Sequence, residues 1–151
     1  MTATGAGPVT TAGIAMTHLG GDRFRIAVRG HETDVDQPVR DGGGDTAPTP
    51  TELFIASLAS CVAFYARRYL ARHQLPTRRL EVRAAYEFGS RPARVTAVRV
   101  ELTPPDGLPP DRRDALLAVA SHCTVHNTLT DPPHVTVSLA AGAGADDAGA
   151  S

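Results

Sequence analysis

The feature that most constrains the fold is an uncharged run of fourteen residues, Leu53 to Ala66. A strong helix start precedes it, because Thr49 can cap the first turn, Pro50 suits the first helical position and Glu52 falls where a capping box places its carboxylate. The run therefore predicts a helix over about residues 50–73. Fourteen uncharged residues are too few to cross a bilayer, so we expect this helix to lie inside a folded domain.

Most of the surface of this predicted helix carries small side chains. At about 100° per residue, one stripe of the helix carries Phe54, Leu58, Cys61 and Tyr65. The remaining positions of the run are mostly alanine and serine. We expect such a helix to pack on several sides, including against a second copy of itself.

Apolar and polar residues alternate on both sides of the helix, which predicts antiparallel strands. The predicted strands are residues 9–18, 23–28, 31–37, 79–88 and 98–103, and a last strand with Val135, Val137 and Leu139 on one side. A second helix is expected after Asp111, with Leu116, Leu117 and Ala120 on its core face. The glycine-rich segment 40–45 lacks the lysine of a phosphate-binding loop and is predicted to be a flexible connection. Strands, a long helix, a hairpin, a second helix and a strand together make an α+β architecture.

Length and composition fit one domain. Residues 1–8 and 140–151 are small and without periodicity, which predicts a flexible N-terminus and a disordered C-terminal tail around a domain of residues 9–139. A net charge of -1 gives no excess of cations to attract nucleic acid or an anionic membrane. The N-terminus has no secretory signal pattern, so we expect the protein in the cytoplasm, where thiols are kept reduced.

The chain has two cysteines, Cys61 in the predicted helix and Cys123 between His122 and His126. In a reducing compartment a cysteine pair is more often catalytic or metal-binding than a structural bridge. If the thiols meet, one thiolate can attack a peroxide, become a sulfenic acid and be captured as a disulfide by the other. Their separation in sequence says nothing about their distance in the fold, and a lone cysteine in an apolar helix is commonly an inert buried thiol.

A reactive Cys61 would need help from other residues, because apolar burial raises the pKa of a thiol and suppresses the thiolate. Arg25 and Arg23 on the second strand are the candidate cations, with Arg40 behind them. Glu52 lies nine residues before Cys61, which is about 13.5 Å along the helix axis and on its opposite face. Only a partner subunit could therefore bring Glu52 to this thiol, and its alternative role is that of a helix cap.

A metal site is a competing interpretation of the second cysteine. His122 and His126 are spaced i, i+4 and could join Cys123 as three ligands of zinc. The pattern is weak, since the chain has no Cys-x-x-Cys pair and adjacent residues diverge by about 100° on a helix. No local signature of a trypsin-like or papain-like site is present either.

The segment from Thr49 to Phe54, the small residues leading to Cys61 and the later Cys123-Thr124-Val125-His126 resemble the OsmC/Ohr family of osmotically inducible proteins and organic hydroperoxide reductases. The resemblance covers nearly the whole predicted domain, including the order of its segments. It differs at three positions. The reductase branch carries a carboxylate where this chain has Thr51, and its second motif often reads Cys-Pro-Val-Ser, where Thr124 and His126 replace the proline and the serine.

The resemblance implies an intertwined homodimer with central helices packed together and two active sites at the subunit interface. It also implies peroxide reduction, with Cys61 as the peroxidatic thiol and Cys123 as the resolving thiol, and with Arg25 and Glu52 as candidates for the supporting groups. No cofactor is implied, because electrons come from an external dithiol, a lipoylated protein in the reductase branch. Two alternatives remain: a non-catalytic stress or binding dimer with inert cysteines, and a metal-binding module using His122, Cys123 and His126.

Overall fold

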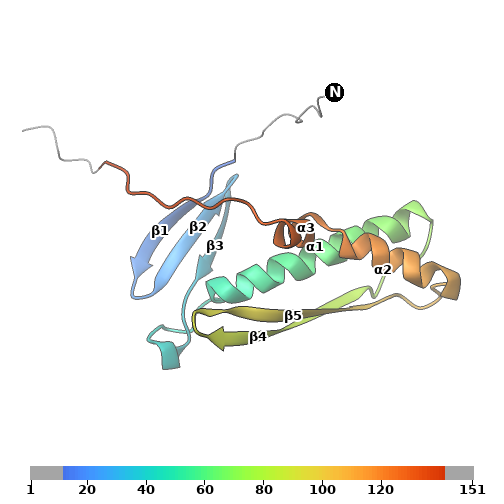
Figure 1. The fold of residues 1–151 in the computed structure, drawn as a ribbon, viewed down its shortest axis with the longest axis horizontal. Helices are drawn as coiled ribbons and strands as arrows, with labels where there is room; N and C mark the ends of the chain where they lie inside the picture. The colour runs from blue at the N-terminus through green and yellow to red at the C-terminus, as the bar shows by residue number, and fades with distance from the viewer. Residues whose placement is uncertain (1–11, 142–151) are drawn as a thin grey trace, which may run out of the picture.

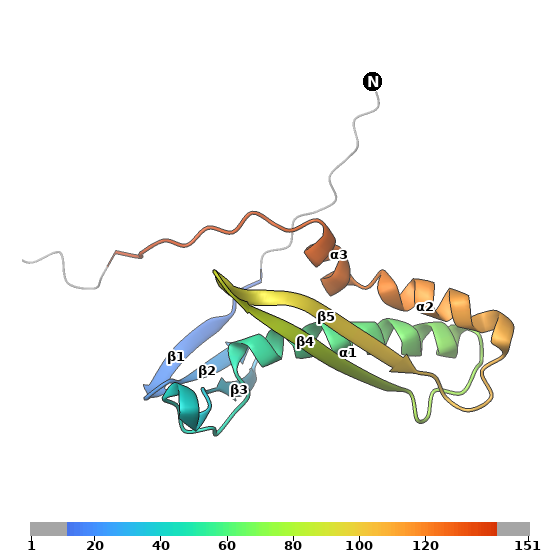
Figure 2. The ribbon, with the colours of Figure 1, turned by 60° about the horizontal axis from the view of Figure 1, so that its bottom comes forward.

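The computed structural model of the protein describes residues 12–141. The predicted flexible N-terminus, residues 1–8, and nearly all of the predicted tail lie outside the described residues. One long helix, α1 (Pro50–Arg72), runs through the molecule. A three-stranded sheet lies beyond its N-terminal end, a two-stranded hairpin runs along it, and two shorter helices pack beside it, as Figures 1 and 2 show. The α+β architecture is thus confirmed.

The N-terminal sheet consists of β1 (Ala15–Gly20), β2 (Arg23–Val28) and β3 (His31–Val35), all antiparallel and in sequence order. Residues 12–14 are not part of a strand, so β1 begins later than predicted within the described chain. The third strand stops at Val35, two residues before its predicted end, because Asp36 turns its carboxylate into the following loop.

Asp36 organises the loop between β3 and α1. Its side chain is 1% exposed and accepts hydrogen bonds from the backbone N–H groups of Gln37 and Gly44 and from both the N–H and the hydroxyl of Thr46, at 2.7 to 3.4 Å. These bonds lower the pKa of Asp36 to about 2, with the Thr46 N–H contributing most. A methyl group at Gly43 would collide with the backbone carbonyl of Gln37. The glycine-rich connection therefore has a defined path around a buried carboxylate, including a short 3-10 turn, η1 (Val39–Asp41).

The start of α1 is as predicted. The Thr49 hydroxyl accepts a hydrogen bond from the Glu52 N–H at 3.1 Å, and a Glu52 carboxylate oxygen accepts one from the Thr49 N–H at 2.8 Å. Pro50 is the first helical residue. This reciprocal capping box fixes where the helix begins.

The core forms on a different stripe of α1 from the predicted one. The buried side chains of the helix are Ile55, Leu58, Val62, Ala66, Tyr69 and Leu70. Phe54 is exposed, whereas Cys61 and Tyr65 lie at the edge of the core, partly buried against it. The long aliphatic and aromatic side chains bury best on the stripe centred on Val62, and this rotates Cys61 to its margin.

The hairpin is confirmed, with β4 (Glu81–Ser90) and β5 (Ala93–Thr103) joined at Arg91-Pro92. Its register pairs Tyr86 with Val98, and a bulge follows between Glu87 and Phe88. The partly buried hairpin side chains that pack on the core are Val82, Val98, Val100 and Leu102. The alternation of apolar and polar residues in the sequence thus indicates which side of the hairpin faces α1.

The C-terminal part departs from expectation. After a 3-10 turn, η2 (Pro110–Arg112), come α2 (Arg113–Ser121), which buries Leu116 and Ala120, and a further helix that was not predicted, α3 (Thr124–Thr130). The predicted last strand is wrong for the described chain: residues 132–141 have no regular structure, and Leu139 is 100% exposed. A strand needs a neighbouring backbone, and none within the described chain pairs with this segment.

By length and composition alone, α1 could cross a membrane, because its most apolar 18-residue window has a mean hydropathy of 1.2. Core helices of globular domains have the same property. In this fold the buried stripe of α1 supplies the centre of the hydrophobic core.

Candidate active site

Cys61 lies in the middle of α1, where the helix passes between the hairpin and the α2–α3 segment. It is partly buried at the edge of the core and carries a free thiol. Its neighbours one turn away are Leu58, which is fully part of the core, and Tyr65, which is partly buried against it. The helix thus holds the thiol rigidly while leaving a side of it open.

Cys123 occupies the junction between α2 and α3. Its extended backbone (φ -70°, ψ 157°) makes it the N-cap of α3, and its sulfur accepts a hydrogen bond from the His126 N–H at 3.4 Å. The residue is 0% exposed and forms part of the same core cluster on which Cys61 packs. The second thiol is therefore fully enclosed, while its backbone sits at a bend between two short helices.

The two thiols are brought together although they are far apart in the chain. Burial raises the pKa of Cys123, and a hydrogen bond and charge repulsion from Cys61 raise it further, against the opposing effect of the His126 and Val125 N–H groups. Both cysteines are free. Because burial and the neighbouring sulfur both raise the pKa of Cys123, its thiol stays protonated at neutral pH.

A second contact joins the same two segments. The hydroxyl of Tyr65, one turn after Cys61, lies 2.8 Å from the hydroxyl of Thr124, the residue after Cys123. The ring of Tyr65 is also packed edge-on against Phe64, with centroids 5.8 Å apart. The sequence gives no sign of this bond, since a tyrosine and a threonine 59 residues apart carry no pattern that links them.

Arg25, the first candidate cation, is engaged within its own sheet. Its Nε donates to Asp34 at 2.9 Å, and its guanidinium lies 3.7 Å from Glu32. The hydrogen bond to Asp34 is the main cause that raises the pKa of Arg25, and it is likewise the main cause that lowers the pKa of Asp34. Arg23 also donates to Asp34, at 3.2 Å. Within residues 12–141, these ion pairs involve carboxylates of β3 and neither thiol.

The other two predicted polar residues also have partners away from the thiols. Glu52 is held in the capping box at the start of α1, as the capping alternative predicted. Arg40 contacts the neighbouring Asp41 at 3.5 Å and is largely exposed. In the described part of the chain, then, the site is made of the two cysteines with Tyr65 and Thr124, and the charged candidates lie elsewhere.

The histidines beside Cys123 bond to backbone carbonyls. Nδ1 of His122 donates to the Ala118 carbonyl at 2.7 Å, and Nδ1 of His126 donates to the Ser121 carbonyl. Among residues 12–141, no three His, Cys, Asp or Glu side chains gather in a way that could hold a metal ion. The geometry of this segment gives the zinc interpretation no support.

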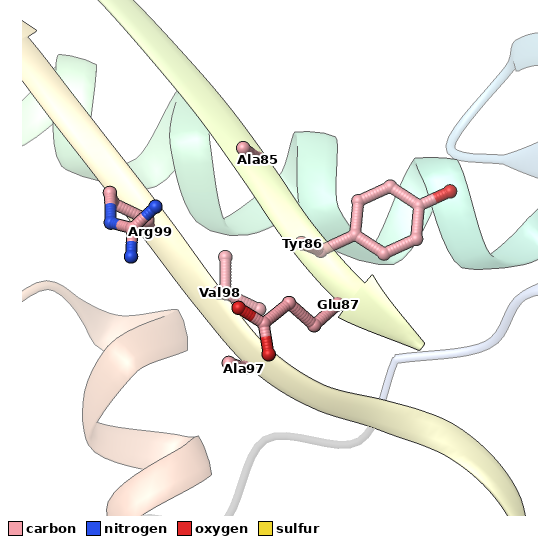
Figure 3. A pocket seen from close by; sticks show the side chains of 6 residues that line it. All are labelled: Ala85, Tyr86, Glu87, Ala97, Val98 and Arg99. Atoms are coloured by element: carbon pink, nitrogen blue, oxygen red, sulfur yellow. The ribbon is translucent and has the colours of Figure 1, made fainter. Parts of the chain in front are cut away.

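Two of the hollows that border the hairpin differ in their lining. One, of about 230 Å³, lies between α1, β5 and α2 and is lined mainly by apolar side chains such as Leu58, Val62 and Val100, with His126 at its edge. The other, of about 350 Å³, lies in the middle of the hairpin; in Figure 3 the ring of Tyr86 extends from β4 away from β5, while Glu87 reaches towards β5. Neither Cys61 nor Cys123 lines either of these two hollows.

The fold and the site define a small α+β protein with a paired-thiol site between its central helix and a helical bend. The sequence model of the family described as OsmC-like protein matches residues 42–138, and the chain belongs to that family. Comparison with curated proteins gives no match.

Solved structures share the fold. A protein from Psychrobacter arcticus 273-4 described as an osmotic stress induced and detoxification response protein is 22% identical, with a TM-score of 0.72 over 83% of this chain and 91% of that one. An organic hydroperoxide resistance protein OsmC from Legionella pneumophila is 19% identical, with a TM-score of 0.64 over 82% of this chain and 91% of that one. At these identities the likeness establishes a common fold.

Proposed function

We propose that the protein is a thiol-dependent peroxidase that reduces hydrogen peroxide or organic hydroperoxides. The observation that carries the proposal is the pairing of two free thiols from distant parts of the chain, one partly exposed and the other fully buried. Membership of a family that includes a protein described as an organic hydroperoxide resistance protein supports it.

The difference between the thiols gives the order of the steps. The Cys61 thiolate attacks a peroxide oxygen and breaks the O–O bond, which yields a Cys61 sulfenic acid and an alcohol, or water from hydrogen peroxide. The Cys123 thiol then displaces the hydroxyl group as water and forms the Cys61–Cys123 disulfide. Burial and a raised pKa keep Cys123 unreactive towards peroxide, so it is suited to the second step.

An external dithiol closes the cycle by exchange with the disulfide. It reduces the bond to two thiols and becomes a disulfide itself, so the electrons balance without a bound cofactor. By the family resemblance, a lipoylated protein is the candidate reductant. The cytoplasm is the proposed compartment, since thiols are kept reduced there.

A homodimer is part of the proposal. Apolar side chains stand unusually exposed on several elements of one chain; these include Phe64 on α1, Phe88 on β4 and Leu139 in the C-terminal segment. A second copy would cover such surface. Since Glu52 caps α1 far from its own Cys61, and Arg25 pairs within its own sheet, a second copy is also the route by which either charged group could reach a thiol.

Mass spectrometry of the intact protein tests the peroxidase directly. One equivalent of hydrogen peroxide or cumene hydroperoxide should remove two hydrogens from the reduced chain. Cys61→Ser should abolish turnover with a dithiol, whereas Cys123→Ser should permit one reduction and then let Cys61 proceed to sulfinic acid. Unchanged mass in the wild type, or full turnover by Cys61→Ser, would instead favour the non-catalytic dimer with inert cysteines.

A further inference from the structure

We propose that the hydrogen bond between Tyr65 and Thr124 is a positioning device that keeps Cys123 in register with Cys61 for disulfide formation. The inference rests on the proposed function, because it assigns a task in the second step of that reaction. Neither residue touches the reacting atoms in this assignment, so both are positioning residues.

The bond joins the two segments that carry the thiols, directly beside them. Tyr65 follows Cys61 by one helical turn, so both side chains leave α1 on the same side. Thr124 is the first residue of α3 and immediately follows Cys123. A hydroxyl pair 2.8 Å apart thus bridges α1 and α3 at the level of the thiols.

Other contacts hold α3 weakly. No side chain of the helix is buried, and Val125 is its residue that packs, partly buried, against the core. The side chains of His126 and Asn127 bond to backbone carbonyls at the end of α2, and so tie α3 to α2 and not to α1. Towards α1 and the core, the bend is held by Cys123, which is the residue that must react. A contact that does not involve the Cys123 sulfur is therefore needed to hold the α2–α3 bend in place while that sulfur forms a new bond.

Disulfide formation, the second step, depends on how Cys123 is placed relative to Cys61. A disulfide forms only with a sulfur–sulfur bond near 2.05 Å and a narrow range of dihedral angles. In the condensation, the Cys123 sulfur attacks the Cys61 sulfenic sulfur, the S–O bond breaks, and the Cys123 proton leaves with the hydroxyl as water. If the start of α3 drifts, Cys123 spends less time in reach, and the sulfenic acid lasts long enough to meet a second peroxide.

Four variants isolate the bond. Tyr65→Phe and Thr124→Val each remove one hydroxyl with little change in shape, and Thr124→Ser keeps the hydroxyl. Thr128→Val is the matched control, since it removes a hydroxyl of α3 that bonds to the backbone carbonyl of Thr124. Rapid quenching and intact mass would follow sulfenic acid and disulfide separately after one equivalent of peroxide.

We expect Tyr65→Phe and Thr124→Val to slow disulfide formation by about two- to tenfold, the effect of one hydrogen bond, without slowing the first oxidation of Cys61. Over-oxidised Cys61 should accumulate at excess peroxide in these two variants. Thr124→Ser and Thr128→Val should behave as the wild type. The double variant Tyr65→Phe with Thr124→Val should be no slower than either single variant, because both remove the same contact.

Equilibrium with dithiothreitol gives a reading that does not depend on peroxide. The oxidised form of this dithiol should convert the cysteine pair to the disulfide less completely, by a similar factor, in Tyr65→Phe and Thr124→Val. Wild-type rates and equilibria in both variants would overturn the positioning role, as would additive losses in the double variant. Absence of any peroxide oxidation in the wild type would overturn the proposed peroxidase instead.

Discussion

At the level of single residues, the site depends on an asymmetry between two chemically identical side chains. Cys61 sits at the edge of the core, whereas Cys123 is enclosed in it and feels both desolvation and the neighbouring thiol. Both effects disfavour a Cys123 thiolate. In the proposed reaction, therefore, position in the fold and not residue type decides which sulfur acts as the nucleophile.

Alkylation should reveal this asymmetry. Brief treatment of the reduced native protein with iodoacetamide near pH 7 should label Cys61 at least about tenfold faster than Cys123, because the thiolate is the reactive form and Cys123 is buried with a raised pKa. Labelling of Cys123 should increase as the pH is raised or when the protein is unfolded. Peptide mapping measures both rates, with Cys123→Ser as the control that should label as the wild type does. Equal rates in native protein would contradict the assignment.

At the level of the elements, the loop between β3 and α1 is held by one carboxylate. The pKa of Asp36 is about 2 in the folded protein and below its ordinary value of 3.8, so the ionised form favours folding. Its stabilising effect is complete above about pH 4 and is lost as the pH falls towards 2.

Asp36→Asn should therefore lower the urea midpoint at pH 7 and should also reduce the fall in stability between pH 4 and 2. The physical reason is that the amide cannot accept the same set of four donors. Urea unfolding over this pH range measures both effects. Asp106→Asn is a suitable control because Asp106 is almost fully exposed and should leave the profile unchanged. If Asp36→Asn loses stability between pH 4 and 2 as steeply as the wild type does, other carboxylates cause that loss.

Elements with strong local signals were predictable from the sequence. The capping box and uncharged run set the start and length of α1, and strict alternation set the hairpin and its inward side. The helix α3 was missed because its sequence, Thr-Val-His-Asn-Thr-Leu-Thr, consists mostly of weak helix formers. The last strand was wrong because alternation at Val135 and Val137 describes a surface suited to pairing without saying which backbone pairs with it.

The site was only partly predictable for a related reason. Both cysteines stand out in the sequence, yet their approach depends on how α1 and the α2–α3 bend pack, and their separation in the chain says nothing about that. The neighbouring Tyr65 and Thr124 give no signal at all before the two segments are placed together. Arg25 was a candidate to activate Cys61 because it is positively charged. The register of β2 and β3, however, places Asp34 directly opposite it.

At the level of the whole molecule, one chain leaves much of its apolar surface without a partner. About a third of the most apolar window of α1 is buried inside the chain. Phe64 is 53% exposed, Phe88 is 60% exposed and the C-terminal segment projects apolar side chains from an unpaired backbone. These exposed apolar side chains are the reason for proposing that a second copy of the chain covers them.

Light scattering with size exclusion should therefore give a mass of about twice 15.8 kDa for the wild type. Phe88→Asp should shift the population towards the single-chain mass, because a charge buried in an apolar interface is strongly unfavourable. Arg83→Glu, on the exposed side of the same strand, is the matched control and should remain dimeric. A wild-type protein that elutes as a single chain at all concentrations would contradict the dimer.

The spacing of the two cysteines along the chain has a consequence for the thermal stability of the oxidised protein. They enclose about 60 residues, and a cross-link closing a loop of that length restricts the unfolded chain enough to stabilise the native state by about 4 kcal/mol. Thermal unfolding after one equivalent of peroxide should therefore occur about 10 °C higher than in the reduced protein, and Cys61→Ser should show no such rise. In the proposed reaction, oxidation by peroxide would therefore also make the native state more stable until a dithiol reduces the disulfide.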